Sequence, residues 1–443
     1  MKKKLYESLK HYKRLNRSSF HTPGHKMNVF GKSGILSLDY TELPLTDSLY
    51  EASGIIKQAE NDLKKLYGSK ESIFSSGGNT LCIQTMLALA AKNKEKILCD
   101  RLVHRSAVSA MALLDIDPIW VKREYNKKSR LFEKIDLKDL KEKLNEKVDY
   151  KAFYTTSPSY YGIIQNISLI SEECKKKSVP VLVDNAHGSH LKFVGENLHP
   201  LDMGAAMSAD SAHKTLPVLT GGAWLHVNDD RFCEDVKNKM ALFGSTSPSY
   251  VVMSSMDIAR DWLKNCGEKE FLKLKSKVEN IKNLAKEKGI FIPDESISDP
   301  VRITLGVWKA GYSGFEFREY LYKYGVEPEF CDSNYTVLIA TPFNTREDFK
   351  KLKKALKEMK VKEEKKLGFE FNFKIPEKLA TIREAIMAKS VKVNINNCVG
   401  KIAADVVCPC PPGVPVVMPG EKISDYEYEV LRRYGISKIN VLK

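Results

Sequence analysis

The chain has 443 residues, which is enough for two or three domains with a large core. Its 71 basic and 56 acidic side chains give a net charge of +15, and its 43% hydrophobic and 29% charged residues exclude a disordered or fibrous protein. The longest nearly apolar stretch, 81–91, is about half of the roughly 20 residues that a membrane-spanning helix needs, so we expect no membrane partner.

Strands and helices are predicted to alternate over the first half of the chain. This alternation is typical of a parallel α/β sheet, in which ligands gather at the carboxyl ends of the strands. The apolar run at 179–183 is typical of a strand that is buried on both faces. We expect helices at 59–66, 80–92, 106–114, 137–144 and 169–177, and strands at 72–75, 96–99, 119–121, 152–155, 179–183 and 205–209.

The pattern of predicted helices and strands changes near residue 260. We expect a long helix at 257–284, then a strand, a helix and a strand at 301–307, 315–324 and 335–340. A lysine-rich helix follows over 350–366, where nine lysines stand against three acids and Thr345 and Asp348 are spaced as in a capping box. We interpret these lysines as a solvated helix face, since the aromatic–basic alternation of a nucleic-acid platform is missing, and expect no nucleic-acid partner.

A proline-rich third unit begins near residue 368, so the predicted domains are 1–260, 261–367 and 368–443. Nine cysteines are too sparse for a disulfide scaffold, and charge interrupts the N-terminus before a signal-peptide core forms. We therefore expect reduced thiols and a cytoplasmic location. The pair Cys408-Pro-Cys410 lacks the spacing of a zinc site, and we predict no metal.

The strongest chemical pattern joins Asp184 to Lys214. An apolar strand delivers Asp184 at its carboxyl end, where a buried carboxylate needs a cationic partner such as a protonated pyridine nitrogen. Lys214 follows a second short strand in Ser211-Ala-His213-Lys214, a setting that suits a Schiff base to an aldehyde cofactor. The order and spacing of Asp184 and Lys214 favour a cofactor site over the alternative, in which Asp184 caps a helix and Lys214 is an ordinary surface lysine.

Four motifs spread over nearly the whole chain carry a family resemblance. They are His21-Thr-Pro-Gly-His25-Lys26, then Asp39-x-Thr-Glu42-Leu-Pro with Asp47 and Glu60, then Ser211-Ala-His213-Lys214, and finally Pro411-Pro-Gly-Val-Pro-x-x-x-Pro-Gly-Glu421. The set resembles the fold-type-I pyridoxal-phosphate enzymes and, among them, the bacterial ornithine/lysine/arginine decarboxylases. The resemblance implies an aspartate-aminotransferase-like α/β fold with a mainly parallel sheet in the large domain, a small α/β domain and an extra C-terminal domain. It also implies a short form without an N-terminal receiver-like domain.

The resemblance implies a pyridoxal 5'-phosphate cofactor. Lys214 would form the Schiff base, Asp184 would pair with the pyridine nitrogen, and His104 would stack on the ring as a third catalytic residue. Glycines at 77–78 open a helix whose free N–H groups suit a phosphate. Further implied cofactor contacts are Gly78, Asn79, Thr80, Ala186, His187, Ser211 and His213, with Ser245 and Thr246 reaching the site of a neighbouring subunit, so that a homodimer or larger homo-oligomer is expected.

The activity that the resemblance implies is decarboxylation of arginine, lysine or ornithine to a polyamine-pathway amine and CO2. A small cationic amino acid needs an acidic receptor. Glu421 is one candidate, and the segment 39–62 is another, because it carries six acids against one base. The acids are Asp39, Glu42, Asp47, Glu51, Glu60 and Asp62.

Two alternatives stay open at this point. An aminotransferase or a C–S lyase would share Lys214 and Asp184, and Arg302 is available to hold an α-carboxylate. A basic nucleic-acid-binding or regulatory protein with a degenerate enzyme fold would explain the charge, but an intact Lys214, Asp184 and His213 speaks against degeneration.

Overall fold

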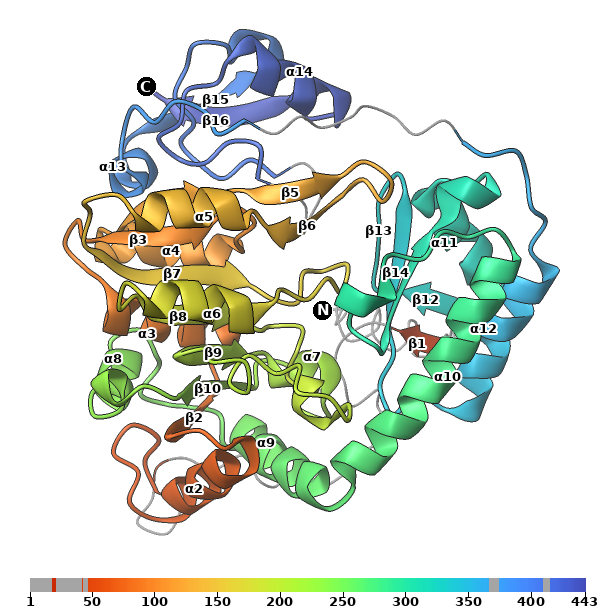
Figure 1. The fold of residues 1–443 in the computed structure, drawn as a ribbon, viewed down its shortest axis with the longest axis horizontal. Helices are drawn as coiled ribbons and strands as arrows, with labels where there is room; N and C mark the ends of the chain where they lie inside the picture. The colour runs from red at the N-terminus through yellow and green to blue at the C-terminus, as the bar shows by residue number, and fades with distance from the viewer. Residues whose placement is uncertain (1–17, 21–41, 43–46, 366–373, 409–414) are drawn as a thin grey trace, which may run out of the picture.

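A computed structural model describes residues 18–20, 42, 47–365, 374–408 and 415–443. Its centre is a seven-stranded sheet in the order β2-β10-β9-β8-β7-β3-β4 (Figure 1), in which β10 alone runs antiparallel to its neighbours. This mainly parallel sheet confirms the predicted fold class. The strands are β2 (Glu71–Ser75), β3 (Lys96–Asp100), β4 (Asp117–Val121), β7 (Tyr150–Thr156), β8 (Val181–Asp184), β9 (Met207–Asp210) and β10 (Ala223–Val227).

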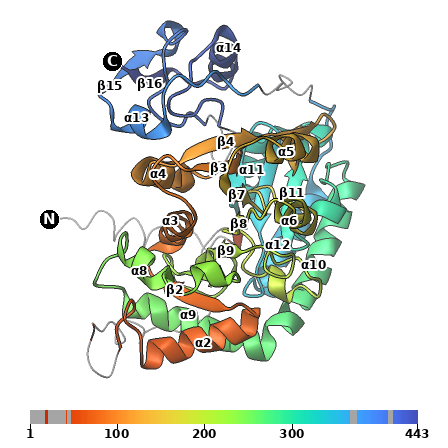
Figure 2. The same ribbon diagram turned by 60° about the vertical axis from the view of Figure 1, so that its left-hand side comes forward.

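Helices cover both faces of the sheet (Figure 2). On one face α3, α4 and α8 bury apolar side chains against the strands, and on the other α5 and α6 do the same. The strands therefore read as apolar runs, since both faces are removed from water. The helices are α2 (Ile55–Tyr67), α3 (Gly78–Ala90), α4 (Arg105–Leu114), α5 (Leu137–Leu144), α6 (Ile167–Lys175), the short α7 (Ala212–Thr215) and α8 (Val236–Ala241).

The predicted long helix is present but starts earlier. It consists of α9 (Tyr250–Trp262), one π-helical segment (Leu263–Gly267) and α10 (Glu268–Glu287). The domain boundary predicted at residue 260 stays a prediction, and that residue lies inside α9.

A smaller sheet follows α10. Its order is β11-β14-β13, and β12 lies nearby, paired in parallel with β1 from the N-terminal region. Both helices of this region, α11 and α12, begin with a capping box, in which the cap side chain and the third helical residue satisfy each other's backbone N–H. The elements are β1 (Ser18–Phe20), β11 (Arg302–Gly306), α11 (Gly314–Lys323), β12 (Val326–Pro328), β13 (Phe330–Cys331), β14 (Tyr335–Ile339) and α12 (Arg346–Glu358).

The lysine-rich helix is shorter than predicted. It ends at Glu358 because Met359 takes an extended conformation, and the chain beyond it bonds to the small domain. The amides of Lys362 and Lys365 donate to the carbonyls of Ala310 and Trp308 at 3.1 and 3.0 Å. Lysine spacing alone could not reveal these partners, so the helical interpretation of the lysine-rich segment fails over 359–365, as far as the structure describes it.

The C-terminal region packs on the large domain beside α4 (Figure 1). A hairpin that the sequence pattern did not predict, β5 (Arg123–Asn126) with β6 (Leu131–Ile135), extends toward it and lends Tyr125 and Phe132 to its core. The C-terminal elements are α13 (Ile382–Met387), β15 (Ser390–Asn394), α14 (Asp425–Arg433) and β16 (Lys438–Leu442).

Several predicted motif residues lie outside the described residues. They are His21 to Lys26, Asp39, Cys410 and the Pro411-Pro-Gly-Val stretch. Among the helices of the described part, none is both long enough and apolar enough to cross a bilayer.

Candidate active site

The predicted site residues converge at the carboxyl edge of the large sheet. Asp184 is the last residue of β8, and Lys214 lies in the short helix α7 directly after β9. The glycines at 77–78 follow β2, and His104 follows β3. Parallel strands bring their carboxyl ends to one edge, so residues far apart in the sequence meet there.

Asp184 is buried and has only neutral partners in the part of the chain that the structure describes. Its carboxylate accepts hydrogen bonds from Asn79 Nδ2 at 2.9 Å, from the Ala186 amide at 3.1 Å and from the Tyr154 hydroxyl at 3.4 Å. Burial raises the pKa of Asp184, and the positive charges of His104 and Lys214 only partly oppose this. The site therefore lacks a cation bonded to this carboxylate.

Lys214 and Arg302 share one imidazole. Lys214 Nζ lies 2.9 Å from His187 Nε2, and both terminal nitrogens of Arg302 lie 3.4 Å from His187 Nδ1. A guanidinium only donates, so His187 Nδ1 accepts and its proton sits on Nε2. Lys214 Nζ then faces the N–H of this imidazole, an arrangement that favours the neutral amine, which can accept a hydrogen bond, over the ammonium, which cannot.

Burial also favours the neutral forms of Lys214 and His187. It lowers the pKa of Lys214, against the opposing field of Asp184 and Glu329. Burial, together with the charges of Lys214 and Arg302, holds the pKa of His187 well below its usual range, so the imidazole is neutral. A neutral amine is the nucleophilic form that attacks an aldehyde.

Three residues that the sequence analysis did not single out complete this cluster. Tyr154 donates to Asp184, while the Tyr160 ring packs edge-on against His187 with the ring centroids 4.6 Å apart. The Tyr160 hydroxyl donates to Glu329, which comes from the small domain between β12 and β13. The position of Tyr154 in a strand next to β8 was a usable signal, but nothing in the sequence placed Glu329 here.

The start of α3 is the loop that the sequence analysis predicts to hold the cofactor phosphate. Gly78 has a φ of +70°, a conformation that favours glycine, and its N–H donates to the Gly221 carbonyl at 2.8 Å. Thr80 is exposed in the first turn. Asn79 points its amide at Asp184, the carboxylate that is predicted to pair with the ring nitrogen.

The other predicted contacts lie around Lys214 or at the surface. His213 Nδ1 lies 3.3 Å from Ser211 Oγ and 3.1 Å from the Gly222 carbonyl, which fixes the turn that holds the lysine. His104 caps α4, where its Nδ1 accepts the Ser106 amide at 3.2 Å. The residues at 245–246 lie in an exposed loop between α8 and α9, and their contact with a second subunit stays a prediction.

The residues fit pyridoxal 5'-phosphate. The protonated ring nitrogen would give Asp184 the cation that it lacks, and the neutral Lys214 amine would meet the aldehyde. The buried Oδ1 of Asn79 and Oγ1 of Thr156 have no hydrogen-bond partner among the residues that the structure describes, which leaves polar groups for a ligand to satisfy.

Three of the seven acidic candidates for substrate recognition have structural roles. Asp47 accepts backbone N–H groups at the start of α2, including those of Gly54 at 2.9 Å and Ile56 at 3.0 Å. Glu60 is buried in an ion pair of 2.7 Å with Lys237. Glu421 forms a buried bidentate pair with Arg101 at 2.5 and 2.7 Å, so it is engaged by the protein itself and is not a receptor for a substrate.

Comparisons with known proteins agree with the architecture. The model of the Orn/Lys/Arg decarboxylase major domain matches residues 3–292, and that of the C-terminal domain of the same family matches residues 372–434. The chain is 30% identical to the uncharacterized protein YaaO of Bacillus subtilis, covering 99% of this chain and 95% of that protein. It is 29% identical to the arginine decarboxylase of the same organism, covering 95% and 91%.

A solved structure gives the same fold. Lysine decarboxylase A from Pseudomonas aeruginosa superimposes with a TM-score of 0.79 at 16% identity, covering 92% of this chain and 74% of that one. The two family models together span both the large domain and the C-terminal region. The chain belongs to the Orn/Lys/Arg decarboxylase family.

Proposed function

We propose that the chain binds pyridoxal 5'-phosphate through Lys214 and decarboxylates arginine. Family membership makes it an amino-acid decarboxylase, a carboxy-lyase that acts on a basic amino acid. The cofactor, the residue roles and the choice of arginine are the proposal. The cytosolic location and the homodimer expected from the sequence belong to the same proposal.

The observation that carries the cofactor assignment is the pairing of two buried groups in complementary states. No cation among the described residues is bonded to Asp184, while burial lowers the pKa of Lys214 beside His187. A buried carboxylate without a bonded cation is costly. The bound cofactor supplies an electron sink for the carbanion that forms when CO2 leaves, and Asp184 stabilises its ring charge.

The protein's own residues would orient the substrate. Arg302 is buried beside Lys214 and presents its terminal nitrogens to the site, which supports a role in holding the α-carboxylate. Lys214 and His187 are 2.9 Å apart and would move the proton that returns to the α-carbon. Glu329 provides a negative charge on the facing small domain.

Arginine is favoured by the relatives. The curated arginine decarboxylase is similar over 95% of the chain, whereas the lysine decarboxylase structure, at 16% identity, speaks for the fold only. The experiment is CO2 release by the purified full-length protein with added pyridoxal phosphate, measured separately on arginine, lysine and ornithine. We expect arginine to be turned over fastest.

Borohydride reduction tests the attachment site. The reduced cofactor should be found on the peptide that carries Lys214 and not on the one that carries Lys282, a second buried lysine whose pKa is lowered by burial. Label on Lys282, or unchanged activity of Lys214→Ala, would refute the proposal. No CO2 release from any basic amino acid, together with amino-group exchange with a keto acid, would favour the aminotransferase alternative.

A further inference from the structure

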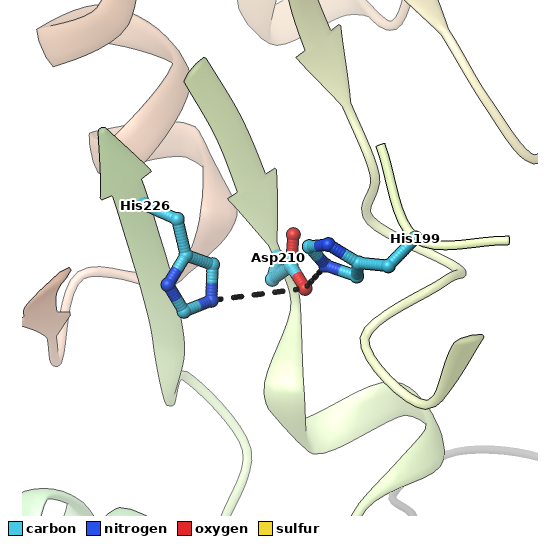
Figure 3. Close-up of side chains that lie close together, drawn as sticks. All are labelled: His199, Asp210 and His226. Carbon is cyan, nitrogen blue, oxygen red and sulfur yellow. Dashed lines mark hydrogen bonds and ion pairs between the residues drawn. The ribbon is translucent and has the colours of Figure 1, made fainter. Parts of the chain in front are cut away.

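A second cluster of ligating side chains lies in the core next to the active site. His199 comes from the loop before β9, Asp210 is the last residue of β9, and His226 lies in β10 (Figure 3). All three residues have an exposed fraction of 0%. None of them belongs to the set that would contact the cofactor.

The three ligand atoms have the spacing of a metal site. His199 Nε2 lies 2.9 Å and His226 Nε2 lies 3.9 Å from Asp210 Oδ2, and all three atoms fall within 4.8 Å of one another. Ligands at about 2.0 to 2.2 Å from a tetrahedral zinc ion lie roughly 3.4 Å apart, between the two observed distances. Figure 3 shows both imidazoles pointing their Nε2 atoms at the same carboxylate oxygen.

Within the described part of the chain, the fully buried His226 Nε2 has no hydrogen-bond partner. The other ring nitrogen, Nδ1, lies 2.7 Å from Ser72 Oγ, whose own neighbour is Ser69 Oγ at 2.6 Å. When His226 Nδ1 carries the proton and donates to Ser72 Oγ, His226 Nε2 presents a lone pair to Asp210 Oδ2. Two lone pairs facing each other in a dry core need a cation between them.

Further contacts hold Asp210, His226 and His199 in place, as hydrogen bonds to other protein groups do for metal ligands. Asp210 Oδ1 accepts hydrogen bonds from Ser208 Oγ at 2.6 Å and Asn185 Nδ2 at 2.9 Å, which directs Oδ2 at the imidazoles. Tyr67 stacks on the His226 ring with the centroids 4.2 Å apart and fixes its plane. The Leu201 amide contacts His199 Nδ1 at 3.4 Å, a long contact that leaves Nε2 able to release its proton to a metal.

We propose that His199, Asp210 and His226 bind a divalent metal ion of the zinc class as a structural site. Two imidazoles and one carboxylate are ligands that Zn2+ accepts, and water or a further protein oxygen would complete a tetrahedron. The ion would join β9, β10 and the preceding loop directly ahead of the turn that carries Lys214. The site is distinct from the active site and does not depend on the function proposed above.

The first test is the metal content of the untagged full-length protein. After incubation with Zn2+ and gel filtration, elemental analysis should find a metal ion that survives buffer exchange. Protein that has been stripped and reloaded with Co2+ should show the visible absorption of cobalt in a tetrahedral nitrogen–oxygen site. Wild-type protein that retains no metal after this treatment would overturn the proposal, and this measurement needs no variant to fold.

A matched pair of variants assigns the ligands. Asp210→Asn keeps the size of the side chain but removes the ligand charge, and should lose the bound metal. Asp299→Asn makes the same change in another fully buried His–Asp pair, in which His190 lies 3.0 Å from Asp299. No third ligand joins this pair among the described residues, so the Asp299→Asn variant should keep the bound metal. Equal metal content in both variants would place the ion elsewhere, for example on the cysteines, and would contradict the proposal.

Discussion

Lys214 is the residue whose protonation state most affects the chemistry, and the shared imidazole of His187 controls it. Arg302 cannot give up its protons, so His187 must accept from it and donate to Lys214. This contact and burial together favour the neutral amine, the form that attacks an aldehyde. The same arrangement makes the folded, cofactor-free chain sensitive to pH.

Replacing Lys214 tests this directly. Burial lowers the pKa of Lys214 in the folded chain, so the unfolded chain binds more protons between that lowered pKa and the ordinary value of 10.5. Cofactor-free Lys214→Met should therefore be more stable than wild type near neutral pH, by roughly 1.4 kcal/mol for each pH unit of the shift. The advantage should shrink as the pH rises toward 10.5, measured by urea unfolding. A stability difference that stays constant with pH would contradict a lowered pKa of Lys214.

Asp184 acts through its charge, and Asp184→Asn isolates that property. The amide keeps the shape but no longer pairs with a protonated ring nitrogen, so kcat should fall at least about 100-fold. Spectroscopic titration should show that the cofactor still binds. A variant with near wild-type kcat would exclude the ring-nitrogen role.

The sequence predicted the strand-end residues but not the residues that face them. Asp184 and Lys214 were found because an apolar strand and a short motif mark them in the chain. Tyr160 and Glu329 were not, since they meet only when the small domain packs against the large sheet. Glu421 was misjudged for a related reason, because its partner Arg101 is distant in the sequence.

At the scale of elements, periodicity identified nearly all helices and strands of the large sheet, while long-range contacts decided the exceptions. The lysine-rich helix ends early because the following backbone finds carbonyl partners in the small domain. The β5–β6 hairpin escaped prediction since its aromatic side chains, Tyr125 and Phe132, are partly buried against the core of the C-terminal region and not against the sheet.

The turn at Gly420 shows how tightly one connection is packed. Its φ is +87°, and a Cβ there would lie 2.2 Å from the Ala380 carbonyl oxygen. Gly420→Ala should destabilise the protein by at least about 3 kcal/mol in thermal unfolding, from backbone strain and overlap together. Gly400→Ala is the control, because its φ is +80° but nothing lies within 4 Å, and it should cost only about 1 kcal/mol. Equal losses would mean that the close approach is relieved by movement.

At the scale of the whole molecule, one buried ion pair joins the C-terminal region to the large domain. Arg101 and Glu421 are 1% and 2% exposed, and Glu421 also accepts the Met418 amide at 2.8 Å. Removing one partner leaves the other charge buried, so Glu421→Gln should cost about 3 to 5 kcal/mol in chemical unfolding. Asp405→Asn breaks the exposed pair with Arg105 between the same two parts of the chain and should cost less than about 1 kcal/mol. Similar losses in both would refute a special role for the buried pair.

The order of strands in the sheet also has a consequence for synthesis on the ribosome. Among the strands of the large sheet, the edge strand β2 is synthesised first. The strand with which it pairs, β10, is complete only when residue 227 has been added. At roughly 5–20 residues per second, about 150 residues and on the order of ten seconds separate the two. During that time β2 has no native strand partner, so we expect the nascent chain to be a substrate for chaperones that hold unpaired segments.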